Sequence, residues 1–341
     1  TPSRLLFATD RDQIARRALR FFAAPPPQHE LPPLAGRLTP GGAESGFMVP
    51  SPTPLAEPIR ELPVTAFREY LACPYRFYLR RVLKLQSRSD AAEELDGALF
   101  GSLVHEVLRQ FGLGPCRDST DPAEIRQYLR EMLERGTVNQ FGRHVLASVQ
   151  VQVEQLRLRL DAFAEKQAER AAAGWTIEST EGQEREHTDA VLDVDGEPMV
   201  LRGRIDRIDV HRETNQRAIL DYKSSDTAKS PEKAHQRNGE WVDLQLPLYR
   251  HLARSQGIEG PVQLGYVLLP KDVEKIEFCT AQWTEADLAA ADEVARQVVR
   301  DIRAEHFWPP TDPPPDFSEE FAAICQDGVF EKTLTEKSPA R

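Results

Sequence analysis

The stretch LDYKSS, residues 220–225, decides how the rest of the chain is interpreted. It follows apolar residues and reads as a strand, in which successive side chains point to opposite faces. Asp221 and Lys223 therefore share one face, and Tyr222 points to the other. A D-x-K pattern alone is most often a solvated ion pair, so its meaning depends on the segment before it.

That preceding segment is GRIDRID, residues 203–209, which also reads as a strand. The turn residues around Thr214 separate the two strands. An antiparallel pairing across this turn would bring Asp206 close to Asp221 at one end of a sheet, with Lys223 alongside. The pattern Asp–spacer–Asp–x–Lys is then a candidate catalytic site.

The chemistry of such a site follows from charge. Two carboxylates a few ångströms apart repel each other unless a cation lies between them, and oxygen ligands suit Mg²⁺ or Mn²⁺. A bound cation makes water more acidic, and a neighbouring lysine can orient that water and stabilise negative charge on a phosphate. The arrangement predicts hydrolysis of a phosphodiester bond.

Composition excludes some classes of protein. The chain has 341 residues, is 40% hydrophobic and carries a net charge of −11, which is not typical of a protein that simply coats nucleic acid. No apolar run approaches the roughly 18 residues of a membrane span, so no membrane partner is expected. Four scattered cysteines indicate a reducing, cytoplasmic setting. Because the chain begins with Thr1, we expect a piece excised from something longer.

The distribution of prolines and of apolar residues predicts the domain organisation. Eleven of the 26 prolines lie between Pro25 and Pro63, a composition typical of a linker or strap. We expect a Pro-rich strap over residues 1–63, with a short helix in residues 5–23. A globular domain should follow over residues 64–308, and a Pro-rich tail over residues 309–341. The globular domain should divide into a helical part, 64–173, and a sheet core, 174–308.

Hydrophobic periodicity predicts the elements of that domain. A helix capped by Thr65 should break at Pro74. Further helices are expected over 97–111, 122–135, 144–172, the segment DLQLPLYRHLARSQ, and 284–304. Strands are expected in WTIEST, DAVLDV, MVLRGRIDRIDV, RAILDYKS and PVQLGYVLL. Helices followed by mainly antiparallel strands and a helix–strand–helix unit indicate an α/β or α+β fold.

Four blocks of the chain resemble, in the same order, the PD-(D/E)XK nucleases of the RecB/AddB type. They are VTAFREYLACPYRFYL (64–79), FGSLVHEVL (100–108), GRIDRID with ILDYKSS, and DLQLPLY (243–249). The resemblance covers roughly residues 62–308. It implies a restriction-endonuclease-like core, a mixed central sheet flanked by helices, with an N-terminal helical elaboration.

The resemblance also implies roles for particular residues. Asp206, Asp221, His105 and the backbone carbonyl of Tyr222 would be metal ligands, and Lys223 would orient water. His105 does not belong to the apolar stripe of its helix, so a plain surface histidine is the alternative.

Three further residues match positions near such sites. Gln245 and Tyr249 lie on one helical face and would contact DNA or support the lysine, although a helix–sheet packing pair is the alternative. Glu181 resembles an additional acid, but the nearby Glu178, Glu184 and Glu186 leave that assignment open.

Basic residues interleaved with aromatic ones suit single-stranded DNA. The candidate DNA-binding side chains are Arg68, Arg76, Arg80, Arg81 and Arg204. The aromatic residues among them could instead belong to the core, with the arginines at its rim.

The cysteines depart from the family pattern. AddB-type members often hold an iron–sulfur cluster, whereas only Cys73 and Cys325 match the expected positions here. Four converging thiolates are needed, so we expect no cluster. In AddB-type members the cluster attaches the C-terminal tail to the first helix. In this chain packing must make that attachment, or the attachment is absent.

The sequence thus predicts a Mg²⁺- or Mn²⁺-dependent deoxyribonuclease, expected to be an exonuclease, within a helicase–nuclease subunit for double-strand break repair. Its partners would be single-stranded DNA or a duplex end and an AddA-like subunit. A stand-alone exonuclease of the same fold and a catalytically inactive DNA-binding scaffold are the alternatives.

Overall fold

A computed structural model describes Arg16 and residues 48–86, 97–142, 145–181, 190–316 and 319–328. The chain divides into two compact units, residues 1–47 and 48–341, and the fold below is that of the second. The helix expected in residues 5–23 lies outside the described residues, apart from Arg16.

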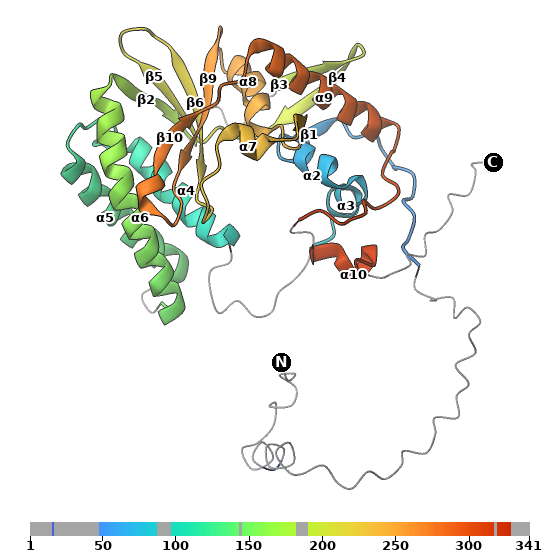
Figure 1. The fold of residues 1–341 in the computed structure, drawn as a ribbon, viewed down its shortest axis with the longest axis horizontal. Coiled ribbons are helices and arrows are strands. Elements are labelled where there is room, and N and C mark those ends of the chain that lie inside the picture. Colours follow the sequence, from blue (N-terminus) through green and yellow to red (C-terminus); the bar gives the residue numbers. More distant parts are fainter. Residues whose placement is uncertain are drawn as a thin grey trace. The chain divides into compact units, whose positions relative to one another are not determined.

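The centre of the second unit is a five-stranded mixed sheet with the order β10-β9-β6-β5-β2 (Figure 1). These strands are Glu277–Thr280, Val262–Leu268, Arg217–Lys223, Arg207–His211 and Trp175–Thr180. β6 pairs antiparallel with β5 and parallel with β9. The predicted mixed sheet flanked by helices is confirmed, and so is the hairpin that turns near Thr214.

The parallel pairing of β6 and β9 requires a long connection between them. It contains α7 (Pro231–His235), the two-stranded ribbon of β7 (Gln236–Arg237) and β8 (Glu240–Trp241), and α8 (Gln245–Ser255). The start of α8 thereby lies beside the carboxyl end of β6, where Asp221 and Lys223 are.

Three helices cover one face of the sheet: α4 (Gly97–Leu113), α5 (Pro122–Phe141) and α6 (Ala147–Ala172). Their buried residues share one apolar cluster with Leu220 and Tyr222 of β6. Asp121 caps α5 by accepting a hydrogen bond from the backbone N–H of Ala123 at 2.9 Å.

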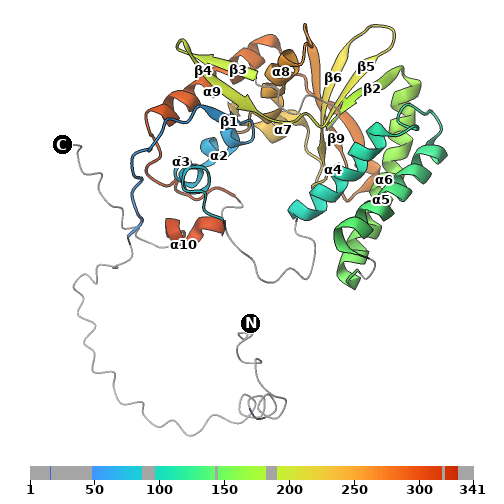
Figure 2. The same cartoon turned by 180° about the vertical axis from the view of Figure 1, so that it is seen from behind.

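On the opposite face of the sheet, α8 packs against β9, and α9 (Glu285–Arg303) and α2 (Ala66–Ala72) extend the same apolar cluster beyond α8 (Figure 2). Ile219 of β6 joins the apolar cluster on this side. Since Ile219 and Leu220 face different clusters, Asp221 and Lys223 share the α8 side, as the strand alternation predicts.

A second sheet of three strands, in the order β1-β4-β3, lies against α8 and α9. Its strands are Glu61–Pro63, Glu197–Arg202 and Ala190–Val194. β3 and β4 form a hairpin whose turn residues, Asp195 and Gly196, both have positive φ angles. Asp195 and Gly196 therefore form the turn that joins the two strands.

The segment that precedes this core is broken at Pro74, as predicted. α2 ends at Cys73, and α3 (Pro74–Phe77) continues into one π-helical turn, η2 (Tyr78–Val82). Thr65 occupies the N-cap position of α2, but its side chain makes no capping hydrogen bond, so that part of the prediction is wrong.

MVLRGRIDRIDV does not form the single strand that the sequence predicts. The chain leaves the second sheet after Arg202 and joins the central sheet at Arg207. Gly203 lies at this corner, where an added Cβ would come within 2.8 Å of Leu252 and 3.0 Å of Val64. Close packing at the corner therefore separates β4 from β5, and Asp206 precedes its strand instead of lying within it.

Short elements complete the described part of the chain. They are η3 (Val273–Lys275), η4 (Glu319–Phe321) and α10 (Ala322–Cys325). Residues 48–63 pack within the second unit, since Val49 is fully buried in its core and β1 pairs with β4. The domain boundary near residue 63 stays a prediction. No helix among the described residues is long and apolar enough to cross a membrane.

Candidate active site

Asp206 lies at the point where the chain enters β5, and backbone groups hold it in place. Its Oδ2 accepts a hydrogen bond from the backbone N–H of Tyr222 at 2.9 Å, which links it to β6. Its carbonyl accepts from the hydroxyl of Thr180 and from the N–H of Glu181, both at 3.1 Å. Asp206 is thus fixed between β2 and β6, with its carboxylate buried.

Three potential ligand atoms converge at this carboxylate. His105 of α4, Glu181 at the end of β2 and Asp206 place one ligand atom each within 4.8 Å of the others. Nδ1 of His105 lies 3.4 Å from Oδ1 of Asp206. The ring of His105 also meets the ring of Tyr222 edge-on, with the centroids 5.8 Å apart. His105, which lies outside the apolar stripe of its helix, therefore faces the acids.

Asp221 forms the centre of a second, adjoining group. Nζ of Lys223 lies 2.7 Å from Oδ2 of Asp221. On its other side, Oδ1 of Asp221 accepts hydrogen bonds from Gln245 Nε2 at 3.1 Å and from the hydroxyl of Tyr249 at 3.2 Å. Gln245 also donates to the Tyr249 hydroxyl at 2.7 Å and accepts from Lys223 at 3.4 Å. Gln245 and Tyr249 thus both contact the Asp221 carboxylate, and Gln245 also reaches Lys223.

The surroundings of Asp206 disfavour its ionised form. Burial, and next the negative charge of Asp221, raise the pKa of Asp206 above its usual value. Burial lowers the pKa of Lys223, but the nearby Asp221 carboxylate outweighs it and leaves that pKa raised. Burial also lowers the pKa of His105, but its hydrogen bond to Asp206 and the negative charge of that residue outweigh the burial, so the pKa of His105 is raised. Burial, with Asp221 and Asp206, raises the pKa of Tyr249 far above its usual value.

These residues fit a divalent cation. A histidine nitrogen and carboxylate oxygens are suitable ligands, and they converge here from different elements. The buried Oδ2 of Asp221 lies 2.7 Å from the ammonium of Lys223. A cation among His105, Glu181, Asp206 and Asp221 would offset the burial and the negative charge of Asp221 that raise the pKa of Asp206.

The neighbouring glutamates differ in their surroundings. Glu178 pairs with Arg217 at 2.6 Å on the surface of the sheet, so among the described acids of this segment it is Glu181 that reaches the cluster. Glu184 and Glu186 lie outside the described residues.

The five arginines considered for DNA binding divide into two groups. Arg204 and Arg68 have side chains 79% and 69% exposed, and they lie at the candidate site. Arg204 pairs with Glu181 at 2.8 Å, and Arg68 lies 3.9 Å from Asp243, whose Oδ1 accepts a hydrogen bond from the backbone N–H of Gln245.

The other three arginines belong to the structure around α3. Arg76 is buried and pairs with Asp327. Arg80 pairs with Glu320 and lies 3.6 Å from Glu69, and Arg81 makes a bidentate contact with Glu69 at 2.7 Å. Arg76 is too buried to reach DNA, and the charges of Arg80 and Arg81 are partly compensated by these acids.

The four cysteines lie in separate parts of the second unit: Cys73 between α2 and α3, Cys116 in the turn after α4, Cys279 in β10 and Cys325 in α10. Cys73 and Cys325 are fully buried, and the Sγ of Cys73 accepts hydrogen bonds from the backbone N–H of Thr311 and from Arg76. Cys116 donates to Glu124, and Cys279 lies in β10. The absence of an iron–sulfur cluster stays a prediction.

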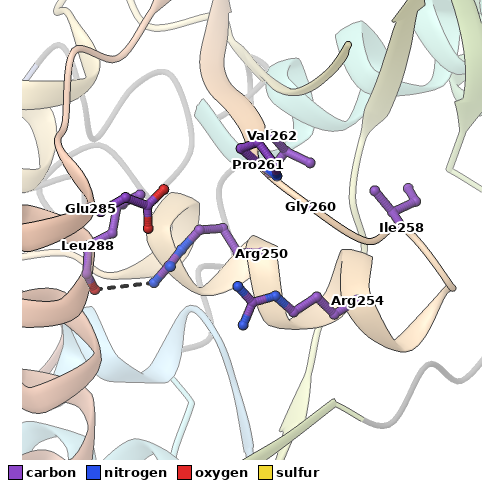
Figure 3. Close-up of a pocket in the computed structure, with 8 residues that line it drawn as sticks. All are labelled: Arg250, Arg254, Ile258, Gly260, Pro261, Val262, Glu285 and Leu288. Carbon is purple, nitrogen blue, oxygen red and sulfur yellow. Dashed lines mark hydrogen bonds between the residues drawn. The ribbon is translucent and has the colours of Figure 1, made fainter. Parts of the chain in front are cut away.

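A shallow pocket elsewhere in the second unit shares no residue with this site (Figure 3). Arg250 and Arg254 line it, together with Glu285 and Leu288 among others. Arg250 donates to the backbone carbonyls of Pro247 and Leu288 and to Asp292. Its guanidinium is therefore engaged in packing α8 against α9, and we assign the pocket no catalytic role.

Comparison with known proteins agrees with this geometry. The PD-(D/E)XK nuclease superfamily matches residues 61–326, most of the chain, and the protein belongs to that superfamily. A curated relative is an ATP-dependent helicase/deoxyribonuclease subunit from Carboxydothermus hydrogenoformans, 25% identical over 257 residues. The match covers 72% of this chain but 23% of the relative, so the chain spans about a quarter of that protein's length.

Proposed function

We propose that this chain is a metal-dependent DNA nuclease that hydrolyses phosphodiester bonds. The observation that carries the proposal is the convergence of His105, Glu181 and Asp206 beside the Asp221–Lys223 pair. Membership of the nuclease superfamily supports the reaction class. Mg²⁺ and Mn²⁺ are the cations that the carboxylate-rich ligand set favours.

In this proposal His105, Glu181, Asp206, Asp221 and the backbone carbonyl of Tyr222 hold the cation. When bound, the cation makes a water molecule more acidic and neutralises charge on the phosphate. Lys223 hydrogen-bonds the attacking water and stabilises the charge that develops on phosphate oxygen. Gln245 and Tyr249 fix the Asp221 carboxylate and the lysine beside it.

Arg204 and Arg68 are the proposed contacts to the DNA backbone. Both are exposed, and each is anchored to an acid next to the reacting groups, at Glu181 and Asp243. The side chains of Arg76, Arg80 and Arg81 are less exposed, at 8%, 41% and 34%, which argues against the wider arginine cluster as a DNA surface.

We further propose that the nuclease acts within a helicase–nuclease subunit, in the repair of double-strand breaks. The name of the Carboxydothermus relative, and the quarter of its length that the chain spans, support this context. An AddA-like partner subunit, exonuclease action and a cytoplasmic location belong to the same proposal.

The test is cleavage of end-labelled single-stranded and duplex DNA in Mg²⁺, Mn²⁺ or EDTA. The wild type should cleave only with metal, and Lys223→Ala should lower kcat by at least about 100-fold because charge stabilisation and proton transfer are both lost. Lys271→Ala, at an exposed lysine, is the matched control. DNA binding without cleavage in any metal would favour the inactive scaffold, and cleavage that appears only with a motor subunit would favour the helicase–nuclease context.

A further inference from the structure

A fully buried histidine lies behind the candidate site, in the connection between β6 and β9. His235 ends α7 and has no exposed surface. Its Nδ1 lies 2.8 Å from the backbone carbonyl of Asp243, and its Nε2 contacts the hydroxyl of Tyr266 in β9. Trp283 packs against the ring edge-on, with the centroids 5.4 Å apart.

The two contacts define the hydrogen positions on the ring. A carbonyl oxygen can only accept, so Nδ1 of His235 carries the proton that it donates to Asp243. In a neutral ring Nε2 is then an acceptor, and the Tyr266 hydroxyl must donate to it. Burial lowers the pKa of His235, which keeps the ring neutral. The histidine thus joins two different elements through one donor and one acceptor.

Both partners of His235 lead directly to the proposed catalytic groups. The ring of Tyr266 lies beneath the ammonium of Lys223, with Nζ 5.0 Å from the ring centroid. Asp243 accepts a hydrogen bond from the backbone N–H of Gln245 at 2.9 Å and so starts α8 at the point where Gln245 reaches Asp221.

We propose that His235 is a positioning residue of the nuclease site, which holds Tyr266 and Asp243 so that Lys223 and Gln245 stay on Asp221. The inference rests on the proposed nuclease function, because the groups that it positions are the proposed catalytic ones. His235 itself touches none of them. Its effect is to fix the lysine and the glutamine relative to a single carboxylate.

Two substitutions separate the two hydrogen bonds of the ring. His235→Asn keeps an N–H near the position of Nδ1 but has no atom at Nε2, so it should lose the Tyr266 contact. His235→Gln extends an amide oxygen to about the Nε2 position and can still accept from Tyr266. We expect His235→Asn to lower kcat by about 10-fold or more with little change in KM. We expect His235→Gln to lower kcat much less than His235→Asn does.

Tyr266→Phe removes the hydroxyl and leaves His235 in place, so it tests the same link without altering the histidine. It should lower kcat as His235→Asn does, and the double variant should be no slower than either single one, because both break one connection. His306→Asn, at an exposed histidine, is the control. A loss of thermal stability with unchanged kcat, or effects that multiply in the double variant, would overturn the inference.

A second measurement does not depend on turnover. If the wild type cleaves no DNA in any metal, with or without a motor subunit, the proposed function fails, and crystal structures of the wild type and His235→Asn decide the positioning role. Displacement of the Tyr266 ring and of Lys223 from Asp221 would support it. An unchanged contact between Lys223 and Asp221 in the variant would refute it.

Discussion

Asp206 and Asp221 are both buried, but each carboxylate has different neighbours. Asp206 faces His105 and Glu181, which can share a cation with it. Asp221 is surrounded by Lys223, Gln245 and Tyr249, which donate hydrogen bonds or positive charge. In the proposed site, Asp206 would therefore lie among the metal ligands, and Asp221 would connect them to the lysine.

Glu181 gives a residue-scale prediction. Glu181→Gln removes one negative oxygen from the ligand set, so we expect the Mg²⁺ concentration for half-maximal cleavage to rise by about tenfold or more. Titration of initial rates with Mg²⁺ measures it. Glu178→Gln, three residues earlier and paired with Arg217, should leave the metal dependence unchanged. Equal shifts in the two variants would count against Glu181 as a ligand.

Some of these residues could be predicted from the sequence, and others could not. Asp221 and Lys223 could, since strand alternation is a local rule that needs no knowledge of the rest of the fold. Glu181 could not be separated from its neighbouring glutamates, because its position depends on where β2 ends beside Asp206. His235 carries no signal of its own, since its role arises from a contact with Tyr266, 31 residues away.

At the scale of elements, the corner between β4 and β5 determines where Asp206 lies. The chain crosses from one sheet to the other within four residues, and α8 packs directly over Gly203 through Leu252. Periodicity alone reads MVLRGRIDRIDV as continuous, because both halves are apolar and alternate. The break is imposed by tertiary packing, which a local pattern does not contain.

Gly203→Ala tests this corner. The new methyl group would lie 2.8 Å from Leu252 and 3.0 Å from Val64, so we expect destabilisation by about 1–3 kcal/mol from overpacking. Urea unfolding measures it. Gly101→Ala is the control, because its Cβ would meet only Ser224 Oγ at 3.9 Å and alanine favours the α4 helix by up to about 1 kcal/mol. An unaltered free energy of unfolding in Gly203→Ala would show that the corner can relax.

At the scale of the whole second unit, residues 319–328 are fastened to the helices that begin it. Arg76 pairs with Asp327, and the guanidinium of Arg80 lies 5.5 Å from the ring centroid of Phe321. Phe321 and Cys325 are buried in the same apolar cluster as α3. The sequence predicts that packing joins this C-terminal segment to the first helices if the two are joined at all. The structure joins them by packing together with ion pairs.

Asp327→Asn should weaken this attachment. It leaves the buried Arg76 without its carboxylate, so we expect a loss of about 3 kcal/mol in the free energy of unfolding. Glu320→Gln breaks the more exposed pair with Arg80 and should cost less than about 1 kcal/mol. Chemical denaturation compares the two, and a smaller effect for Asp327→Asn than for Glu320→Gln would contradict the argument.

The parallel pairing of β6 with β9 has a consequence for how this nuclease could change over evolution. The proposed reacting groups lie between His105 and Tyr249, and β9, β10 and α9 all follow them along the chain. Of these later elements, β9 pairs directly with β6, β10 pairs with β9, and α9 packs against α8. Mutations in this stretch would therefore act on the rate through β6 or through side chains such as Tyr266, which lies beneath Lys223, and would leave the proposed reacting groups themselves unchanged.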